Sequence, residues 1–309
     1  MMKHQWHSHT FRAMGSRISL WLEYEDGEAA CAALHQTEAM FAVAETRLTR
    51  FSETSELSRL NERPEMWVPV SNVLWRMVGL AVERARETNG LFDPTTLPAL
   101  ELAGYGRSFE LLPAQPTLPS GSGAPCGGWQ QVRFDAAQQA IWLPEGVRLD
   151  MGGIGKGVMA QQAMNFLSQW GACLVDAGGD LVAGDGPTGS VGWPVGIGAP
   201  WSQPDETPRD LLRLWLRNGS LATSGVDYRR WGNAHHLIDP RTGRPAETDV
   251  VTASVLAADA SRAEAWATAA LIAGLDDGLE LLEAAGLPAA LVDERQRVYM
   301  TEKMYPLVM

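Results

Sequence analysis

The sequence predicts an α+β fold with mixed, largely antiparallel sheets and packed helices. Short strand-like runs often follow one another directly, whereas neighbouring parallel strands need a long crossover between them. Helical runs lie among the strands without the strict alternation of a parallel α/β fold. With 309 residues, 45% of them apolar, the chain can bury a sizeable core. No linker-like segment divides it, so we expect a single domain over residues 1–309.

Residues 11–24 begin the series of predicted strands. Ile18, Leu20 and Leu22 recur there at every second position, and the Asp26-Gly27 pair that follows is typical of a turn. We therefore expect one strand that enters a turn. Shorter runs rich in strand-forming residues predict further strands over residues 140–143, 174–177, 212–216, 250–256, 289–292 and 298–301.

Four segments carry the pattern of a helix, with apolar residues at helical spacing. Ser71 is suited to cap one of them, and Gly90, Gly171 and Gly274 are typical helix stops. The predicted helices span residues 29–48, 71–90, 157–170 and 261–273. Residues 113–128 are rich in Pro, Gly and Ser, which predicts a surface loop.

The charge of the chain limits its partners. Asp and Glu outnumber Lys and Arg by 37 to 25, and the formal net charge is -12. This balance argues against nucleic acid or an anionic membrane as the main partner. A metal ion or the amino end of a helix would still supply a local positive pole for an anionic ligand.

The start of the chain shows no apolar stretch of the kind that a secretory signal or a membrane span requires. As given, the sequence predicts a cytoplasmic protein without a membrane span, whereas a removed export signal would place it in the periplasm. His4, His7 and His9 resemble a metal cluster, but we interpret them as part of a polar, frayed terminus. Cys31 and Cys173 lie in apolar runs and are predicted to be buried.

The densest glycine cluster, residues 150–157, follows a strand-like segment (147–149) and opens a predicted helix. Its sequence is Asp150-Met151-Gly152-Gly153-Ile154-Gly155-Lys156-Gly157. Free amides at the helix start, with Lys156 beside them, would attract phosphate oxygens. The cluster is neither a Walker A loop, since Gly157 stands where Ser or Thr is needed, nor a dinucleotide fingerprint. The alternative is a tight strand-to-helix turn with a solvated lysine.

Two further segments combine turn residues with polar side chains. Asp176-Ala177-Gly178-Gly179-Asp180 is either an ordinary turn or a loop whose acidic residues reach a ribose hydroxyl. Thr223-Ser224-Gly225 precedes His235-His236 and the turn from Asp239 to Gly243. Adjacent residues of a strand point to opposite faces, so one histidine at most serves a site, and the spacing to the turn favours His236.

Glu264 and Thr268 are four residues apart in the predicted helix 261–273. They share one face, where a carboxylate and a hydroxyl could meet a hard cation. The alternative is an amphipathic helix with one exposed glutamate.

Taken together and in order, these segments resemble the FAD:protein FMN transferase family, also called the ApbE-like family. The resemblance covers nearly the whole chain. Its motifs are Phe11-Arg12-Ala13-Met14-Gly15-Ser16, Arg50-Phe51-Ser52 with Ser55-Glu56-Leu57 and Asn61, Asn89 to Thr95, Asp150 to Gly157, Ala177-Gly178-Gly179-Asp180, Thr223-Ser224-Gly225, His236 to Pro240 with Thr242-Gly243, and Glu264 to Thr268.

The resemblance implies an ApbE-like fold and a particular reaction. Such enzymes bind FAD with Mg²⁺, split its pyrophosphate, and attach FMN to a Thr or Ser hydroxyl of a target flavoprotein, releasing AMP. The implied partner is the acceptor domain of that flavoprotein. Positioning and charge neutralisation supply most of the catalysis in this kind of transfer.

The resemblance also implies roles for individual residues. Met14, Phe51 and Asp93 would line the flavin and adenosine pocket, and Asp180 would hold the ribose or an adjoining loop. Gly152, Gly153 and Lys156 would cradle the pyrophosphate, with Lys156 also catalytic, and Ser224 would contact FAD. The Gly153 carbonyl, Glu264 and Thr268 would bind Mg²⁺, and His236 would accept the proton of the target hydroxyl.

The sequence departs from the family pattern at three places. Ser16 replaces Thr, Val226 is inserted before the usual Asp-Tyr pair, and Glu264 stands where Asp is usual. A longer carboxylate side chain requires either that its helix lie further back or that Mg²⁺ bind more weakly. Glu264 therefore leaves open the alternative of a flavin-binding carrier or assembly protein without transferase activity. A hydrolase that cleaves FAD with water also stays open, because the sequence does not identify an acceptor.

Overall fold

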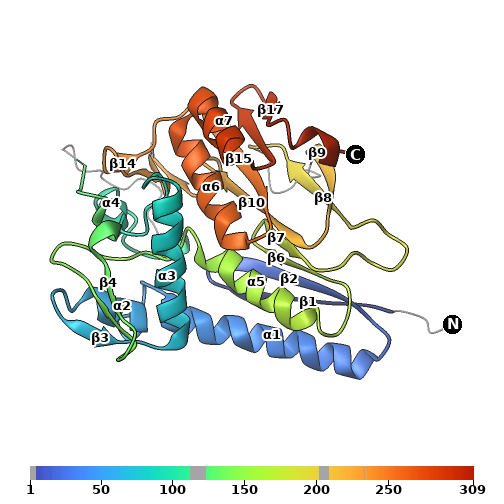
Figure 1. Cartoon of the computed structure of the whole chain (residues 1–309), viewed down its shortest axis with the longest axis horizontal. Helices are drawn as coiled ribbons and strands as arrows, with labels where there is room; N and C mark the ends of the chain where they lie inside the picture. Colours follow the sequence, from blue (N-terminus) through green and yellow to red (C-terminus); the bar gives the residue numbers. More distant parts are fainter. Residues whose placement is uncertain (1–4, 112–122, 202–208, 233) are drawn as a thin grey trace.

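An eight-stranded sheet organises the computed structural model, which describes residues 5–111, 123–201, 209–232 and 234–309. Every neighbouring pair of its strands is antiparallel, which confirms the predicted α+β class (Figure 1). In spatial order the strands are β1 (Gln5–Ala13), β2 (Ser16–Tyr24), β6 (Cys173–Ala177), β7 (Asp180–Ala183), β10 (Gly219–Gly225), β15 (Val250–Ala257), β16 (Ala289–Asp293) and β17 (Val298–Met300).

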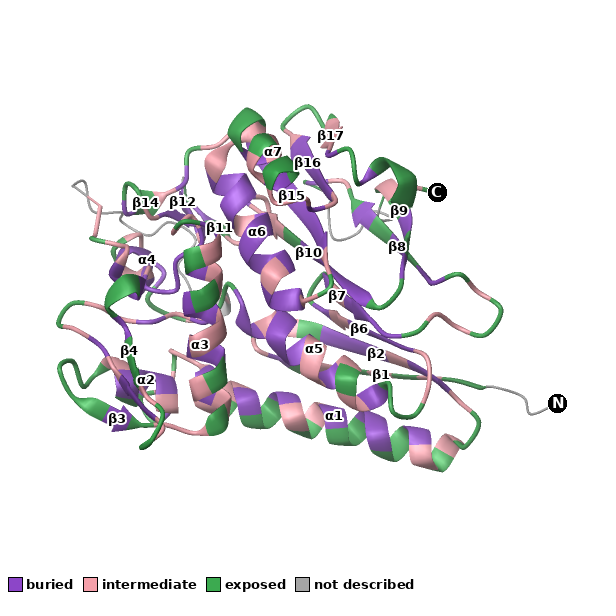
Figure 2. Cartoon of the chain, viewed as in Figure 1, coloured by how far each residue is buried: buried purple, intermediate pink, exposed green. Residues whose placement is uncertain are grey.

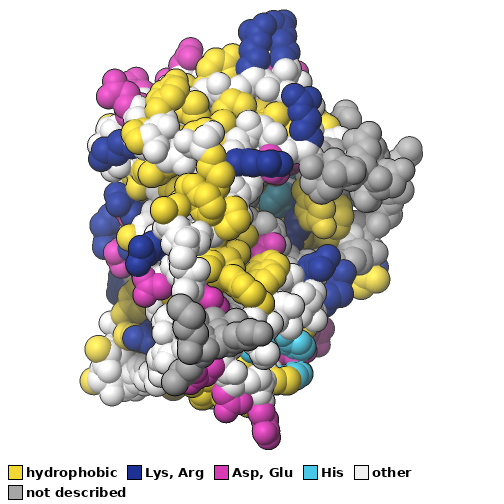
Figure 3. Space-filling model, turned by 90° about the vertical axis from the view of Figure 1, so that its right-hand side faces the viewer, with side chains coloured by type: hydrophobic (Ala, Val, Ile, Leu, Met, Phe, Trp, Pro, Cys, Tyr) yellow, Lys and Arg dark blue, Asp and Glu magenta, His cyan; other side chains and the backbone are white. Residues whose placement is uncertain are grey.

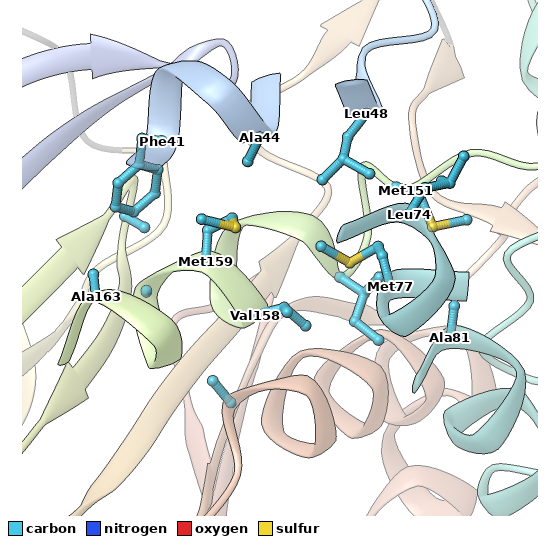
Figure 4. Close-up of a cluster of buried hydrophobic side chains, with 14 of the residues drawn as sticks. Phe41, Ala44, Leu48, Leu74, Met77, Ala81, Met151, Val158, Met159 and Ala163 are labelled. Atoms are coloured by element: carbon cyan, nitrogen blue, oxygen red, sulfur yellow. The ribbon is translucent and has the colours of Figure 1, made fainter. Parts of the chain in front are cut away.

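Helices cover one face of this sheet (Figure 1). They are α1 (Gly27–Leu48), α5 (Gly155–Leu167), α6 (Ala260–Ala273) and α7 (Leu275–Ala284). Most of α6 is buried, whereas α1 has one buried stripe and one exposed face (Figure 2). A further helix, α3 (Asn72–Glu87), packs beside them, and Leu48, Met77 and Val158 meet in the core where α1, α3 and α5 come together (Figure 4).

A hairpin of β8 (Trp193–Gly198) and β9 (Asp210–Leu216) covers the opposite face of the sheet. Leu174 and Leu221 of the sheet pack there with Trp193 and Leu214. The neighbouring Val175 belongs instead to the core under the helices. Successive strand residues thus serve the two faces alternately, because side chains of a strand alternate in direction.

The remaining α-helices and strands are short. They are the helices α2 (Glu56–Asn61) and α4 (Leu97–Leu102), a three-stranded sheet of β3 (Trp67–Pro69), β4 (Arg133–Asp135) and β5 (Ala140–Trp142), and two two-stranded ladders, β11 (Arg230–Trp231) with β12 (Ala234–His235) and β13 (Ile238–Asp239) with β14 (Arg244–Pro245). No helix within the described ranges is both long and apolar enough to cross a membrane.

The strand predicted over residues 11–24 is confirmed for residues 16–24, which form β2, but it is wrong as a single strand, because residues 11–13 belong to β1 of the same hairpin. Ala13 pairs with Ser16, and the two residues between them, Met14 and Gly15, have φ of 53° and 65°. A two-residue turn of this hand matches the twist of the strands that it joins. Met rarely adopts a positive φ, so the sequence at Met14 carries no signal of a turn.

The interpretation of the first histidines as a frayed terminus is also wrong for His7 and His9, which lie in the paired part of β1; His4 lies outside the described residues. Cys31 is exposed on α1, contrary to the prediction, while Cys173 is buried. Most of the predicted loop 113–128 lies outside the described residues, and 123–127 has no regular secondary structure. The single-domain organisation stays a prediction.

Candidate active site

One cavity of about 700 Å³ lies where the β1–β2 turn, the start of α5, the end of β10 and one face of α6 meet. The structure brings all eleven predicted site residues to its lining. They are Met14, Phe51, Asp93, Gly152, Gly153, Lys156, Asp180, Ser224, His236, Glu264 and Thr268. These residues are spread over about 250 positions of the sequence, from Met14 to Thr268.

The glycine loop before α5 is held by side chains from elsewhere in the chain. Asn61 donates to the Leu149 carbonyl at 2.9 Å and accepts from its N–H at 2.8 Å. The side-chain amide of Asn61 thus bonds the backbone N–H and carbonyl of Leu149, which a neighbouring strand would otherwise bond. The strand predicted over residues 147–149 is wrong, because these residues form no strand. Asp150 accepts from the Gly152 N–H at 2.7 Å and forms an ion pair with Arg50 at 2.5 Å. Helix α5 then begins at Gly155, two residues earlier than predicted.

Lys156 connects two buried carboxylates across the cavity wall. Its Nζ donates to Asp180 and, at 3.2 Å, to Oε1 of Glu264. The other oxygen of Asp180 accepts from the N–H of Thr223 at 3.2 Å, and Oε2 of Glu264 accepts from that of Gly157 at 3.0 Å. With side chains of Asp180 and Glu264 only 7% and 5% exposed, the alternatives of a solvated lysine and an exposed glutamate are both wrong.

Two carboxylates share one ammonium in this cluster, which makes the ionised form of Glu264 unfavourable. Burial raises the pKa of Glu264, Asp180 raises it further, and Lys156 opposes both effects. Burial also disfavours the charge on Lys156, but the two carboxylates outweigh it and raise the pKa of the lysine. An additional cation would therefore stabilise the ionised form of Glu264.

Helix α6 presents oxygen atoms of the kind that a hard cation binds. Glu264 and Thr268 are one helical turn apart and both line the cavity, and the Thr268 hydroxyl lies 2.9 Å from that of Ser224. Carboxylate, hydroxyl and backbone carbonyl oxygens are the ligands that Mg²⁺ takes in proteins. Gly153, whose carbonyl is the third predicted ligand, lines the same cavity.

His236 directly follows β12 and lines the cavity, whereas Nε2 of His235 is bound to the Ala246 carbonyl at 2.9 Å. Burial lowers the pKa of His236 to about 3, helped by the positive charge of Arg229 and by His235 and opposed by a backbone hydrogen bond with Arg229. The ring is therefore neutral near pH 7. Its Nδ1 is buried and, among the described residues, has no hydrogen-bond partner.

Asp93 organises a loop at the cavity wall. One of its oxygens accepts from the N–H and the hydroxyl of Thr95 at 2.7 and 2.6 Å, and the other accepts from the Gly127 N–H at 2.6 Å. Burial raises the pKa of Asp93, while these three hydrogen bonds oppose the shift. The carboxylate thus ties residues 93–95 to Gly127, so Asp93 shapes the pocket that it lines.

The sequence did not indicate Arg50 as a site residue. Its guanidinium lies 4.3 Å from the ring centroid of Phe51 and 4.7 Å from that of Tyr105, and its Nη2 is buried without a hydrogen-bond partner in the described part of the chain. All three side chains line the cavity. The position of Arg50 directly before Phe51 is a sequence signal that it lies near the cavity. The ion pair with Asp150, a hundred positions away, has no such signal.

The fold is that of the ApbE family. The family model matches residues 14–291, and the chain belongs to the family. The predicted family is therefore confirmed. Curated relatives are named FAD:protein FMN transferase: that of Treponema pallidum is 29% identical, over 86% of this chain and 78% of its own length, and that of Haemophilus influenzae is 25% identical, over 86% and 80%.

Solved structures show the same fold. The ApbE protein of Thermotoga maritima superposes with a TM-score of 0.83 at 24% identity and covers 99% of this chain and 100% of its own. The apo form of the flavinyl transferase ApbE of Pseudomonas stutzeri gives a TM-score of 0.82 at 22% identity, covering 100% and 99%. The α+β class and the arrangement of the sheet are thus shared with this family.

Proposed function

We propose that this chain is an enzyme that transfers FMN from FAD to a Thr or Ser hydroxyl of a target flavoprotein and releases AMP, with Mg²⁺ as its metal ion. One observation carries the proposal: Lys156, Asp180, Glu264, Thr268 and His236 converge on one cavity of a chain that belongs to the ApbE family. The names of the curated relatives support the same activity.

Binding of FAD depends on an aromatic ring and on positive charge. Phe51 is 47% exposed and lines the cavity, so it offers a ring for stacking against the flavin or the adenine. The amides of Gly152 and Gly157 already donate to Asp150 and Glu264. The main chain of Gly153 and the third N–H of the Lys156 ammonium, which already donates to Asp180 and Glu264, remain to contact the diphosphate. Met14 and Ser224 line the rest of the cavity.

Glu264, Thr268 and the Gly153 carbonyl would hold the metal ion. Mg²⁺ bound there would neutralise charge on the diphosphate. The raised pKa of Glu264 supports this assignment, because a bound cation would favour the ionised carboxylate that burial and Asp180 disfavour. Asp180 is fixed by Lys156 and by the N–H of Thr223, which keeps the turn between β6 and β7 in place.

His236 is the proposed proton acceptor. As the hydroxyl oxygen of the target forms its bond to the phosphorus of the FMN half, the hydroxyl proton passes to the imidazole. The bond between that phosphorus and the bridging oxygen breaks, and AMP leaves with the oxygen. A ring that is neutral at pH 7 has the acceptor lone pair that this step requires.

The experiment is an incubation of the chain with FAD, Mg²⁺ and a candidate acceptor domain. In-gel flavin fluorescence on the acceptor, together with one AMP per label, would support the transferase. AMP without a labelled acceptor would identify a hydrolase, and intact FAD retained by the protein would identify a carrier. An unbiased search for flavinylated proteins in cells with and without this chain would supply the acceptor. The cytoplasmic location stays a prediction.

A further inference from the structure

A second cluster of metal-ligating side chains lies outside the cavity, between β1 and α1. It consists of His9 on β1 and His35 and Glu38 on α1. One ligand atom of each residue lies within 4.8 Å of those of the other two, and no other trio of His, Cys, Asp or Glu in the described ranges meets this condition. Figure 3 shows histidine side chains at the surface beside acidic ones, low on the face that it presents.

The cluster follows from how β1 lies along α1. Every second residue of β1 faces the helix: Phe11 lies with its ring centroid 5.5 Å from that of Phe41, and His9 lies 4.6 Å from His35. His35 and Glu38 are three residues apart on α1 and therefore project from the same side of it. Nε2 of His9 donates to Oε2 of Glu38 at 2.6 Å.

The orientation of His35 suits a metal ligand. Its Nδ1 lies 2.9 Å from the backbone carbonyl of Cys31, one helical turn earlier. Donation from Nδ1 to a backbone carbonyl fixes the tautomer and leaves the lone pair on Nε2, which is the arrangement found in many metal-binding histidines. The side chains of His9 and Glu38 are 23% and 41% exposed, so an ion can reach them from solvent.

We propose that His9, His35 and Glu38 form a binding site for a divalent transition metal ion, with Zn²⁺ as the best match. Two imidazole nitrogens and one carboxylate oxygen are a common zinc ligand set, with a fourth position open to water. Bonds of about 2.0 to 2.1 Å place the ligand atoms about 3.3 Å apart. The His9–Glu38 pair therefore has to open by about 0.7 Å. The proton that Nε2 of His9 donates to Glu38 has to move to Nδ1 of the same ring, so that the lone pair of Nε2 can bind the metal ion. Mg²⁺ does not compete, because it prefers oxygen ligands.

The site would join an edge strand to the longest helix. Within the described sheet, β1 is hydrogen-bonded on one side only, to β2. It ends at Ala13, directly before Met14, which lines the active-site cavity. A metal ion at His9 would stabilise the strand that carries Met14, and this inference does not depend on the transferase activity.

Zinc titration of the whole chain tests the site. Calorimetry is done with millimolar Mg²⁺ present, so that the oxygen ligands of the cavity are occupied by their own ion. We expect one equivalent of Zn²⁺ to bind, and Co²⁺ to give visible absorption bands typical of low coordination number. His35→Ala and Glu38→Gln should each weaken zinc binding at least about tenfold. His35 is exposed and Ala favours helix, so the first variant should fold.

His7→Ala is the matched control. His7 lies on the same face of the same strand, but its Nε2 is bound to the Tyr24 carbonyl at 3.2 Å and it is outside the cluster. Zinc binding should be unchanged in this variant, and also in Glu264→Gln, which alters the cavity. Absence of stoichiometric binding, or equal binding by the wild type, His35→Ala and Glu38→Gln, would overturn the proposal. Circular dichroism without zinc establishes that each variant is folded.

Discussion

The N–H of Gly157 donates to Oε2 of Glu264 at 3.0 Å, and a Cβ at position 157 would lie 2.5 Å from that same oxygen. The first turn of α5 thus binds a carboxylate from α6. Any side chain at position 157 would collide with that carboxylate where it now lies. Negative charge is favourable at the amino end of a helix. Glycine at 157 is therefore a condition for the position of Glu264.

Replacement of Gly157 by Ala should displace Glu264 and reduce turnover at least about tenfold, because the carboxylate would lie away from Lys156. The measurement is the initial rate of acceptor labelling, read by in-gel fluorescence. Gly79→Ala is the matched control, since Gly79 also lies in a helix and a Cβ there meets nothing within 4 Å. That control should keep full activity and raise stability by about 0.5 to 1 kcal/mol. Equal rates for both variants would contradict the role of Gly157.

Glu264→Gln should lower turnover about a hundredfold and weaken FAD binding much less, because it removes one charged ligand while the stacking surface remains. Labelling rates and FAD binding, followed by flavin fluorescence, are measured in parallel at several Mg²⁺ concentrations. Glu264→Asp, which keeps the carboxylate on a shorter side chain, should retain much of the activity. An undiminished rate for Glu264→Gln would remove this residue from the metal site.

His236→Gln should slow the chemical step by about 10²- to 10⁴-fold, the usual contribution of a general base. The Michaelis constant for FAD should change little, because the proton transfer occurs after binding. Single-turnover labelling separates the chemical step from product release. His235→Gln is the control, as His235 is bound to the Ala246 carbonyl on the other side of the strand. Full activity of His236→Gln would require a different proton acceptor.

Acidification should destabilise the FAD-free protein in part through His236. Burial lowers the pKa of its ring to about 3, against an ordinary value of 6.5. Between these values the unfolded chain binds a proton that the folded chain does not. The free energy of unfolding is therefore unaffected by this histidine above about pH 6.5. It decreases as the pH falls towards 3, by up to about 1.4 kcal/mol per pH unit. Urea unfolding from pH 7.5 to 4.5 should show a smaller loss for His236→Gln than for the wild type, and identical slopes would contradict the prediction.

Part of this site could be predicted from patterns of neighbouring residues in the sequence. The spacing of Glu264 and Thr268 placed both on one face of α6, and the glycine cluster before α5 marked the loop that carries Lys156. The predicted helix 29–48 agrees with α1 to within two residues. These features depend on neighbours a few positions apart, which periodicity and turn chemistry describe well.

The features that the sequence did not reveal depend on distant partners. Asn61 holds Leu149 from 88 positions away, and the Asp93 carboxylate binds the N–H of Gly127 across 34. The turn at Met14 was hidden for a different reason, because its positive φ belongs to a residue that seldom adopts one. Patterns of residues a few positions apart carry no information on such contacts. The contacts that hold the cavity wall together could therefore not be predicted from the sequence.

Lys156, held between Asp180 and Glu264, acts as a resident counter-ion. Without it, Asp180 and Glu264 would face each other with no positive charge between them, and the pKa of Glu264 would rise further. The lysine thus ties the β6–β7 turn to α6 before any ligand binds, and a site that is held together in advance loses less binding energy to rearrangement.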